Sequence, residues 1–426
     1  MRSIEIKRHA YTKKGAARPG VAPVGGRSRD MEASVTLSTP ARQTVENLLS
    51  MRFGTRVSIA SVNDFPYSQV SRCTLEAAGS AAPSTVIVRV PRVDPARSGL
   101  ARLRNEHAAL EFLSSIGSTL APRFIAGDAT AGLLVTEDLG TDPSLLDLLL
   151  GDDKGAARQG LLAFARGLGT LHAQTAGRAS AYAERRAQLG PADPDAEDAA
   201  VRFRVAESWQ HVQDAVARLR LPRPRGVDHD VAEVVRTFAA PGVYLALSSG
   251  DPSPVNCKIA QGAVRFFDFE GANFRHALID ASVLRYLYPT GGPPWRLPND
   301  MADPIELAYR EEMARVCPAA VDDADYERGI AAACAAWTIL RMVRLPRVEA
   351  GPDRNPWLLL PPGWSAPIPT RSRRRQLVAI IDTFIASARR AGTFQTLASW
   401  CESMVDALRA RWPEATEPIP LYPAFQ

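Results

Sequence analysis

Residues 247–270 read LSSGDPSPVNCKIAQGAVRFFDFE, and this stretch decides the fold prediction. Asp251 and Asn256 stand five residues apart on a proline-rich loop. Two short apolar runs follow, separated by the turn residues Gln261 and Gly262, and Asp268 comes directly after the second run. Alternating runs joined by a short Gly-containing turn are typical of a β-hairpin. We therefore expect a hairpin that returns Asp268 to the side of Asn256.

This set of side chains matches the needs of phosphoryl transfer. That reaction requires a carboxylate to orient the attacking hydroxyl and accept its proton, together with oxygen ligands that hold Mg²⁺ on the phosphates. Magnesium takes few protein ligands, usually one or two carboxylates plus other oxygens. Taken alone, Asp before Pro and Asn in a loop are ordinary turn formers. The joint spacing of Asp251, Asn256 and Asp268 favours the chemical interpretation over that one.

The stretch resembles the H-G-D-x-x-x-x-N … D-F-G/E signature of aminoglycoside phosphotransferases, choline kinases and related kinases of small hydroxyl compounds. The matching residues are Gly250-Asp251, Asn256 and Asp268-Phe269-Glu270. The resemblance implies that Asp251 is the catalytic base and that Asn256 and Asp268 bind Mg²⁺ with ATP. It also implies that Asp280 is a structural residue at the start of a helix.

The surrounding sequence predicts an α+β, two-lobed fold of the protein-kinase type. Short β-type runs precede and follow one helical pattern in the N-terminal part, and most of the remainder is helical. We expect a basic, disordered tail over 1–35, a nucleotide-binding lobe with a small antiparallel sheet over 36–140, and a mainly helical lobe over 141–426. The expected strands lie at 57–62, 69–75, 85–90, 123–126 and 132–137, and the helix between them at 100–115.

The resemblance also assigns nucleotide-binding residues in the first lobe. Arg89 stands where the family has the basic residue of the third strand, with Arg92 as the alternative cation, and Glu106 is placed as its acidic partner. A cation on a rigid strand neutralises phosphate charge, and a carboxylate fixes its direction. Ser68 lies in the segment expected to cover the nucleotide.

The run LLVTEDLG at 133–140 resembles the strand that carries the adenine-binding backbone in this family. Glu137 and Leu139 are therefore assigned to cofactor binding, although an ordinary edge strand explains the same residues. His172 lies in a helix-end pattern, and we interpret it as a packed residue rather than a catalyst.

Two positions depart from the family pattern. Ser249 stands where the family usually has His, and Arg89 replaces the usual Lys. A guanidinium is bulkier and planar, so the two cations are not interchangeable. These departures leave a second hypothesis open, in which the chain is a catalytically degenerate relative that binds a nucleotide or ligand and acts through a partner.

The charge distribution and the apolar runs argue against two other classes of protein, nucleic-acid-binding proteins and membrane-spanning proteins. The 426 residues carry a net charge of +5, but residues 1–30 hold eight basic and two acidic residues, so the rest of the chain is slightly acidic. This distribution argues against a nucleic-acid-binding body. No apolar run is long enough for a membrane span, and the five scattered cysteines indicate a reduced, cytoplasmic protein.

The expected partner is a small molecule with a hydroxyl group, such as an antibiotic, an amino alcohol or a sugar-like compound. The sequence holds no P-loop, HExxH zinc helix or GxSxG elbow to support another chemistry. The segments around 178–240 and 290–375, which set the acceptor in this family, carry no pattern that identifies it.

Overall fold

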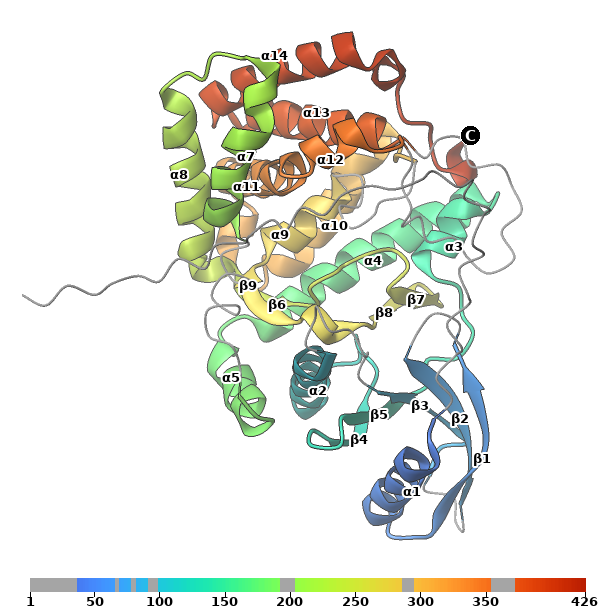
Figure 1. Cartoon of the computed structure of the whole chain (residues 1–426). Helices are drawn as coiled ribbons and strands as arrows, with labels where there is room; N and C mark the ends of the chain where they lie inside the picture. Colours follow the sequence, from blue (N-terminus) through green and yellow to red (C-terminus); the bar gives the residue numbers. More distant parts are fainter. Residues whose placement is uncertain are drawn as a thin grey trace, which may run out of the picture.

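The computed structural model describes most of the chain. The ranges that it describes are 37–65, 69–77, 82–90, 99–191, 204–285, 295–353 and 372–426. Figure 1 shows a small sheet beside one helix at one end of the molecule and a larger mass of helices at the other. The predicted α+β, two-lobed architecture is confirmed.

The smaller lobe is built on a five-stranded antiparallel sheet with the order β1-β2-β3-β5-β4. Its strands are β1 (Val57–Asp64), β2 (Val70–Ala77), β3 (Thr85–Arg89), β4 (Phe124–Asp128) and β5 (Leu133–Glu137). All five predicted strands are confirmed, with ends that differ by at most two residues.

The alternation of side chains in β3 decides which residues reach the cleft. Val86 and Val88 are buried on one face, so Ile87 and Arg89 point to the other face. Helix α1 (Thr39–Phe53) covers the first face, where Val45 and Leu49 join the small apolar core. Its N-cap is Ser38, whose side chain accepts the backbone N–H of Ala41.

The remaining described elements are helices, short 3-10 turns and two small two-stranded sheets. The sheets pair β6 (Leu245–Ser248) with β9 (Asn273–His276), and β7 (Cys257–Ala260) with β8 (Ala263–Phe266). The helices are α2 (Gly99–Ser115), α3 (Leu145–Leu150), α4 (Lys154–Thr175), α5 (Ala179–Gln188), α7 (Val205–Val216), α8 (Gly226–Ala239), α9 (Leu278–Ala281), α10 (Ala302–Met313), α11 (Asp323–Met342), α12 (Leu345–Ala350), α13 (Arg373–Ala391) and α14 (Gln395–Arg411).

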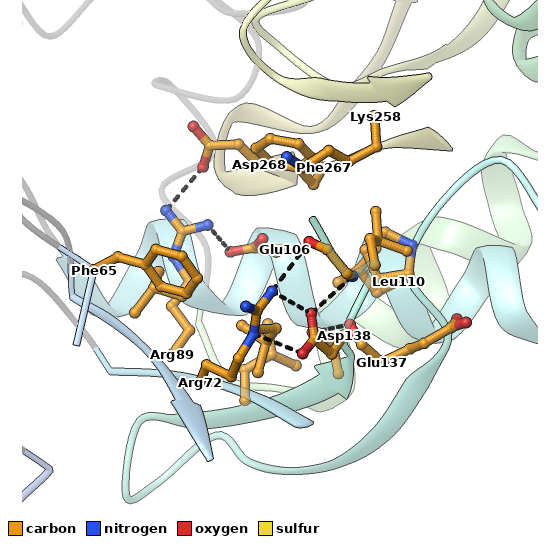
Figure 2. A pocket seen from close by; sticks show the side chains of 17 residues that line it. Phe65, Arg72, Arg89, Glu106, Leu110, Glu137, Asp138, Lys258, Phe267 and Asp268 are labelled. Carbon is orange, nitrogen blue, oxygen red and sulfur yellow. Dashed lines mark hydrogen bonds and ion pairs between the residues drawn. The ribbon is translucent and has the colours of Figure 1, made fainter. Parts of the chain in front are cut away.

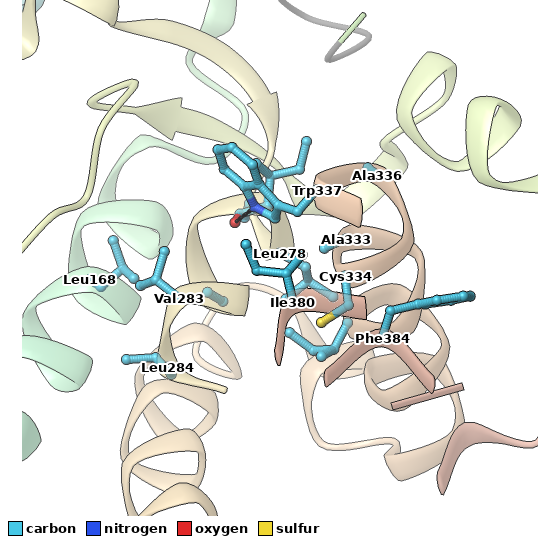
Figure 3. Packing of buried hydrophobic residues seen from close by; sticks show 14 of the residues in the cluster. Leu168, Leu278, Val283, Leu284, Ala333, Cys334, Ala336, Trp337, Ile380 and Phe384 are labelled. Atoms are coloured by element: carbon cyan, nitrogen blue, oxygen red, sulfur yellow. Dashed lines mark hydrogen bonds between the residues drawn. The ribbon is translucent and has the colours of Figure 1, made fainter. Parts of the chain in front are cut away.

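The larger core forms around α11, which is rich in alanine and buried on most sides. Figure 3 shows Leu278 of α9 and Phe384 of α13 on either side of Cys334 of α11, and Leu168 of α4 further off beside Val283. Small side chains on α11 let neighbouring helices approach closely and keep the interior dense. The apolar face of α2 also joins this larger core, so α2 links the sheet to the helical lobe.

Two expectations about the whole chain can be checked. All five cysteines are buried and none forms a disulfide, as the sequence predicted. Among the described residues, no helix combines the length and apolar character that a bilayer crossing needs.

Candidate active site

Asp251 and Asn256 lie on the loop between β6 and β7. Asn256 donates its side-chain amide to the carbonyl oxygen of Asp251 at 3.0 Å, and Ser253 donates its backbone N–H to the same oxygen at 2.7 Å. The five-residue separation of Asp251 and Asn256 therefore allows a hydrogen bond that joins the two ends of the loop. Because the amide nitrogen of Asn256 is used inside the loop, its side-chain oxygen is left to serve as a ligand.

The β7–β8 hairpin returns Asp268 to this loop, as predicted. Cys257 pairs with Phe266, and the backbone N–H of Phe267 donates to the carbonyl oxygen of Asn256 at 3.0 Å. Asp268 follows directly, with a left-handed backbone (φ 66°) that turns the chain away from the strand. The backbone ladder thus places Asp268 beside Asn256.

A contact between two glycines joins the loop of Asp251 to the turn after Asp268. Gly250 has a φ of +91°, which an L side chain rarely adopts. A β-carbon built on Gly250 would stand 2.4 Å from the carbonyl oxygen of Gly271, so only glycine fits here. Gly250 is recognisable in the sequence through the motif, whereas no local pattern marks Gly271.

A buried network of hydrogen bonds holds the start of the loop that carries Asp251. Asp280 is fully buried and accepts hydrogen bonds from Ser248 Oγ and from Arg275 Nη2, both at 2.8 Å. Ser248 Oγ in turn accepts the backbone N–H of Gly250 at 2.9 Å. His172 is also buried, with Nε2 3.6 Å from the Asp280 carboxylate, so it is a packed residue as expected.

Burial alone would raise the pKa of Asp280, but Arg275 and the hydrogen bonds around the carboxylate hold that pKa at about 2. Asp280 is therefore an anion that orients the loop, which agrees with its expected structural role. Ser249, where the family has His, is buried next to this network. Arg275 was missed by the sequence analysis because nothing in the local pattern of β9 marks it.

Arg89 lies at the centre of a cluster of carboxylates, which Figure 2 shows in part. Its Nη1 is 2.5 Å from Glu106, and its Nη2 contacts Asp268 at 2.8 Å and Glu270 at 3.1 Å. Arg102 forms a further ion pair with Glu270. The predicted pairing of Arg89 with Glu106 is present in the structure. Burial raises the pKa of Glu106 above its ordinary value, against the opposite effect of Arg89.

A cavity of about 370 Å³ extends from this cluster to the strand β5 and the link that follows it. Arg89, Glu106 and Asp268 line one part, and apolar side chains line much of the rest. Such a cleft, mainly apolar with a few convergent charges, is typical of a small-molecule site. Its apolar lining residues are Phe65, Val70, Ile87, Leu110, Pro122, Leu134, Leu139 and Phe267.

Arg72 bridges the sheet and the link after β5, as Figure 2 shows. Its Nε and Nη2 bind the carboxylate of Asp138 at 2.7 and 2.8 Å, and Nη2 also donates to the carbonyl oxygen of Gly140. Burial raises the pKa of Asp138, but these bonds lower it overall. The sequence analysis missed Arg72, although alternation along β2 puts it on the face opposite the buried Ser71 and Cys73.

The remaining predicted cofactor residues differ in their placement. Leu139 lines the cavity. Glu137 borders it, but its carboxylate points away in Figure 2 and binds Arg265 at 2.7 and 2.9 Å. The hydrogen bond from Arg265 lowers the pKa of Glu137. Ser68 and Arg92 lie outside the described residues.

The residues near Asp268 suit a magnesium ion bound with phosphates. Arg89 uses one carboxylate oxygen of Asp268, which leaves the other oxygen for a ligand, and that side chain is 30% exposed. Within the described ranges, no hydrogen bond to the side-chain oxygen of Asn256 is recorded, so that oxygen is available to a ligand. One carboxylate and one amide oxygen are a set that Mg²⁺ accepts.

Comparison with known proteins finds similarity at the level of structure. No family model and no curated protein sequence matches the chain. An aminoglycoside phosphotransferase from Alicyclobacillus acidocaldarius aligns with a TM-score of 0.43 and 15% identity, over 82% of this chain and 93% of that one. A macrolide 2'-phosphotransferase from Brachybacterium faecium aligns with a TM-score of 0.42 and 16% identity, over 73% and 94%.

A choline kinase from Streptococcus pneumoniae aligns with a TM-score of 0.38 and 14% identity, over 85% of this chain and 100% of that one. These similar structures come from the group of kinases that the motif at 250–270 resembles.

Proposed function

We propose that this protein transfers the γ-phosphoryl group of ATP to a hydroxyl group of a small polar molecule. The observation that carries the proposal is the close contact between two loops, made where Gly250 meets Gly271. One loop holds Asp251 and Asn256, and the other follows Asp268, which lines the same cavity as the cation Arg89.

The cavity is suited to the nucleotide. The apolar side chains of Val70, Ile87 and Leu134 supply surfaces on which a nucleobase can pack, and the backbone after β5 supplies its polar partners. Arg89, directed by Glu106, lies where the phosphates would enter. ATP bound with Mg²⁺ would supply the phosphoryl group and the charge neutralisation, and Asn256 and Asp268 would hold the ion.

Asp251 has the role of the base. It accepts the proton of the acceptor hydroxyl as the new oxygen–phosphorus bond forms and the bond from the γ-phosphorus to ADP breaks. Since the Asp280 network holds the backbone of this loop at Gly250, the carboxylate of Asp251 is carried on a rigid support. Positioning of this kind is the main contribution that a protein makes to phosphoryl transfer.

The test is intact-mass and product analysis with Mg²⁺-ATP and a panel of antibiotics, amino alcohols and sugars. The wild type should add one phosphoryl group to an acceptor. Asp251→Asn should lower the rate by about 10²–10⁴-fold and leave ATP affinity nearly unchanged, because removal of a general base affects the transition state. Asp152→Asn, an exposed substitution before α4, is the control and should keep full activity. Full activity of Asp251→Asn contradicts the assignment.

The contact between Arg89 and Asp268 favours a second candidate. A guanidinium held by three carboxylates could occupy the position of the metal permanently, which would make the chain a binding protein without catalysis. A thermal-shift titration separates the two, because a ligand that binds only the folded state raises the melting temperature. Stabilisation by ATP that needs Mg²⁺ supports the kinase. Stabilisation that is indifferent to Mg²⁺, without turnover of any acceptor, supports the binding protein.

A further inference from the structure

A second cavity, of about 790 Å³, is separate from the nucleotide cavity and meets it at Glu137, the last residue of strand β5. Its walls come from the loop after α2, the start of β4, helix α4 and the β7–β8 hairpin. Figure 1 shows that hairpin between α4 and the sheet. Glu137 borders both cavities, and the other residues that line the second one take no part in the proposed phosphoryl transfer.

The lining of this rear cavity is strongly basic. Three arginines line it, Arg123, Arg166 and Arg265, against the single carboxylate of Glu137. Arg123 and Arg166 are exposed to the cavity and solvent. The charge of Arg123 acts on Glu137 and helps to lower the pKa of that carboxyl, and within the described ranges no ion pair is recorded for Arg166. The lining therefore has an excess of two positive charges.

Arg265 is the most constrained of the three. It binds both oxygens of Glu137, and its Nη2 donates to the carbonyl oxygen of Ala121 at 2.8 Å. Its Nε is buried, and within the described part of the chain it has no hydrogen-bond partner. A buried donor without a partner is costly, so this nitrogen adds to the strain of the arginine and is not itself a contact for a ligand.

The cavity walls are held by short backbone contacts. The N–H of Phe266 in β8 donates to the carbonyl oxygen of Leu120 at 2.7 Å. Helix α4 packs directly on β8, since a β-carbon on Gly167 would stand 2.0 Å from Val264 Cγ1. Arginines from separate segments thus line one preformed space, which lowers the cost of ordering them around a ligand.

We propose that the rear cavity binds a small organic phosphate monoester. A phosphate monoester carries nearly two negative charges at neutral pH, which matches the excess charge of the lining. Arginine presents planar, forked donors that fit phosphate oxygens. The aliphatic lining of Leu120, Ala163 and Val264 receives the organic part, which a free inorganic anion lacks. This site is independent of the proposed transfer reaction.

The experiment is isothermal titration of the full chain with phenyl phosphate, with phenol and inorganic phosphate as separate ligands. Phenyl phosphate should bind most tightly of the three. Arg123→Gln and Arg166→Gln should each weaken its binding about tenfold, the value of one charged hydrogen bond. The matched control is Arg158→Gln, an exposed arginine on the same helix that does not line the cavity, and it should leave the affinity unchanged.

Three results overturn the proposal. They are absence of phenyl phosphate binding to the wild type, an affinity that Arg123→Gln and Arg166→Gln do not change, and an equal loss in Arg158→Gln. The second result would place the ligand elsewhere, such as beside Arg89 in the nucleotide cavity. The melting temperatures of the variants are compared with that of the wild type. Equal values show that a loss of affinity is not caused by unfolding of the variant. A failure of phosphoryl transfer leaves these results unaffected, so the two proposals are tested separately.

Discussion

Gly250 lies against Gly271 so closely that a β-carbon on Gly250 would come within 2.4 Å of the Gly271 carbonyl oxygen. The contact joins the two loops that carry the candidate catalytic groups, and it does so through backbone rather than side chains. Any side chain at Gly250 must therefore separate the loops. The same residue has a φ of +91°, so a substitution also strains its own backbone.

Gly250→Ala should destabilise the fold by about 3 kcal/mol, from backbone strain together with overpacking. Gly262→Ala is the matched control, because Gly262 has a φ of +77° but no atom within 4 Å of a built β-carbon. The control should lose only about 1 kcal/mol. Urea unfolding measures both. Equal losses in the two variants would show that the contact with Gly271 has no energetic role.

Asp280→Asn should destabilise the protein by about 3–5 kcal/mol, since it leaves Arg275 buried without its anion. The comparison is Asp303→Asn, which removes a similar pair with Arg390 at 2.9 Å but on the surface, and should change stability by less than about 1 kcal/mol. Chemical unfolding at neutral pH distinguishes them. A loss for Asp280→Asn as small as that for Asp303→Asn would contradict the role given to the network.

The stability of the protein should fall as the pH drops below about 6.5, in part because of His107. Burial lowers the pKa of His107 to about 4, so the folded chain resists a proton that the unfolded chain accepts. The contribution of His107 to stability is therefore fully present above the pKa that it has in the unfolded chain. It is lost progressively as the pH falls towards the pKa that it has in the folded chain, by about 2 kcal/mol near pH 5.

The variant for this test is His107→Phe, which keeps an aromatic ring against Phe124 at a site where the rings stack at 4.8 Å. Unfolding free energies from pH 7 to pH 5 should depend less on pH in this variant than in the wild type. An unchanged dependence would assign the loss to other groups, of which the buried His276, with a pKa of about 3, is the next to examine.

Glu106→Gln should weaken ATP binding about tenfold, because Arg89 loses the charged partner that fixes its direction. Glu184→Gln, an exposed change on α5, serves as the control. Titration calorimetry with ATP and Mg²⁺ measures the affinities. Arg89→Lys should still bind ATP. A lysine side chain reaches less far towards the three carboxylates, but it keeps one positive charge in the cavity for the phosphates. An ATP affinity in Glu106→Gln equal to that of the wild type would contradict the assignment of Arg89 to phosphate binding.

Much of this protein is determined by local sequence. Short β-type runs between turn-rich segments predicted the five strands, because such runs are read locally whatever the sheet packs against. The spacing from Asp251 to Asp268 predicted the hairpin, because a two-residue turn with positive φ at Gln261 and Gly262 allows only one return path. The pairing of Arg89 with Glu106 followed from a family resemblance that spans strand and helix.

Contacts between segments distant in the chain were decided by the tertiary structure alone. The bridge from Arg72 to Asp138 spans 66 residues, and the approach of Gly250 to Gly271 depends on how β6 pairs with β9. Arg123, Arg166 and Arg265 come from three separate elements and share a cavity only after those elements pack. The periodicity of a sequence shows on which face of its own helix or strand a side chain lies. It does not show which other element will pack against that face, because this is set by the packing of the whole chain.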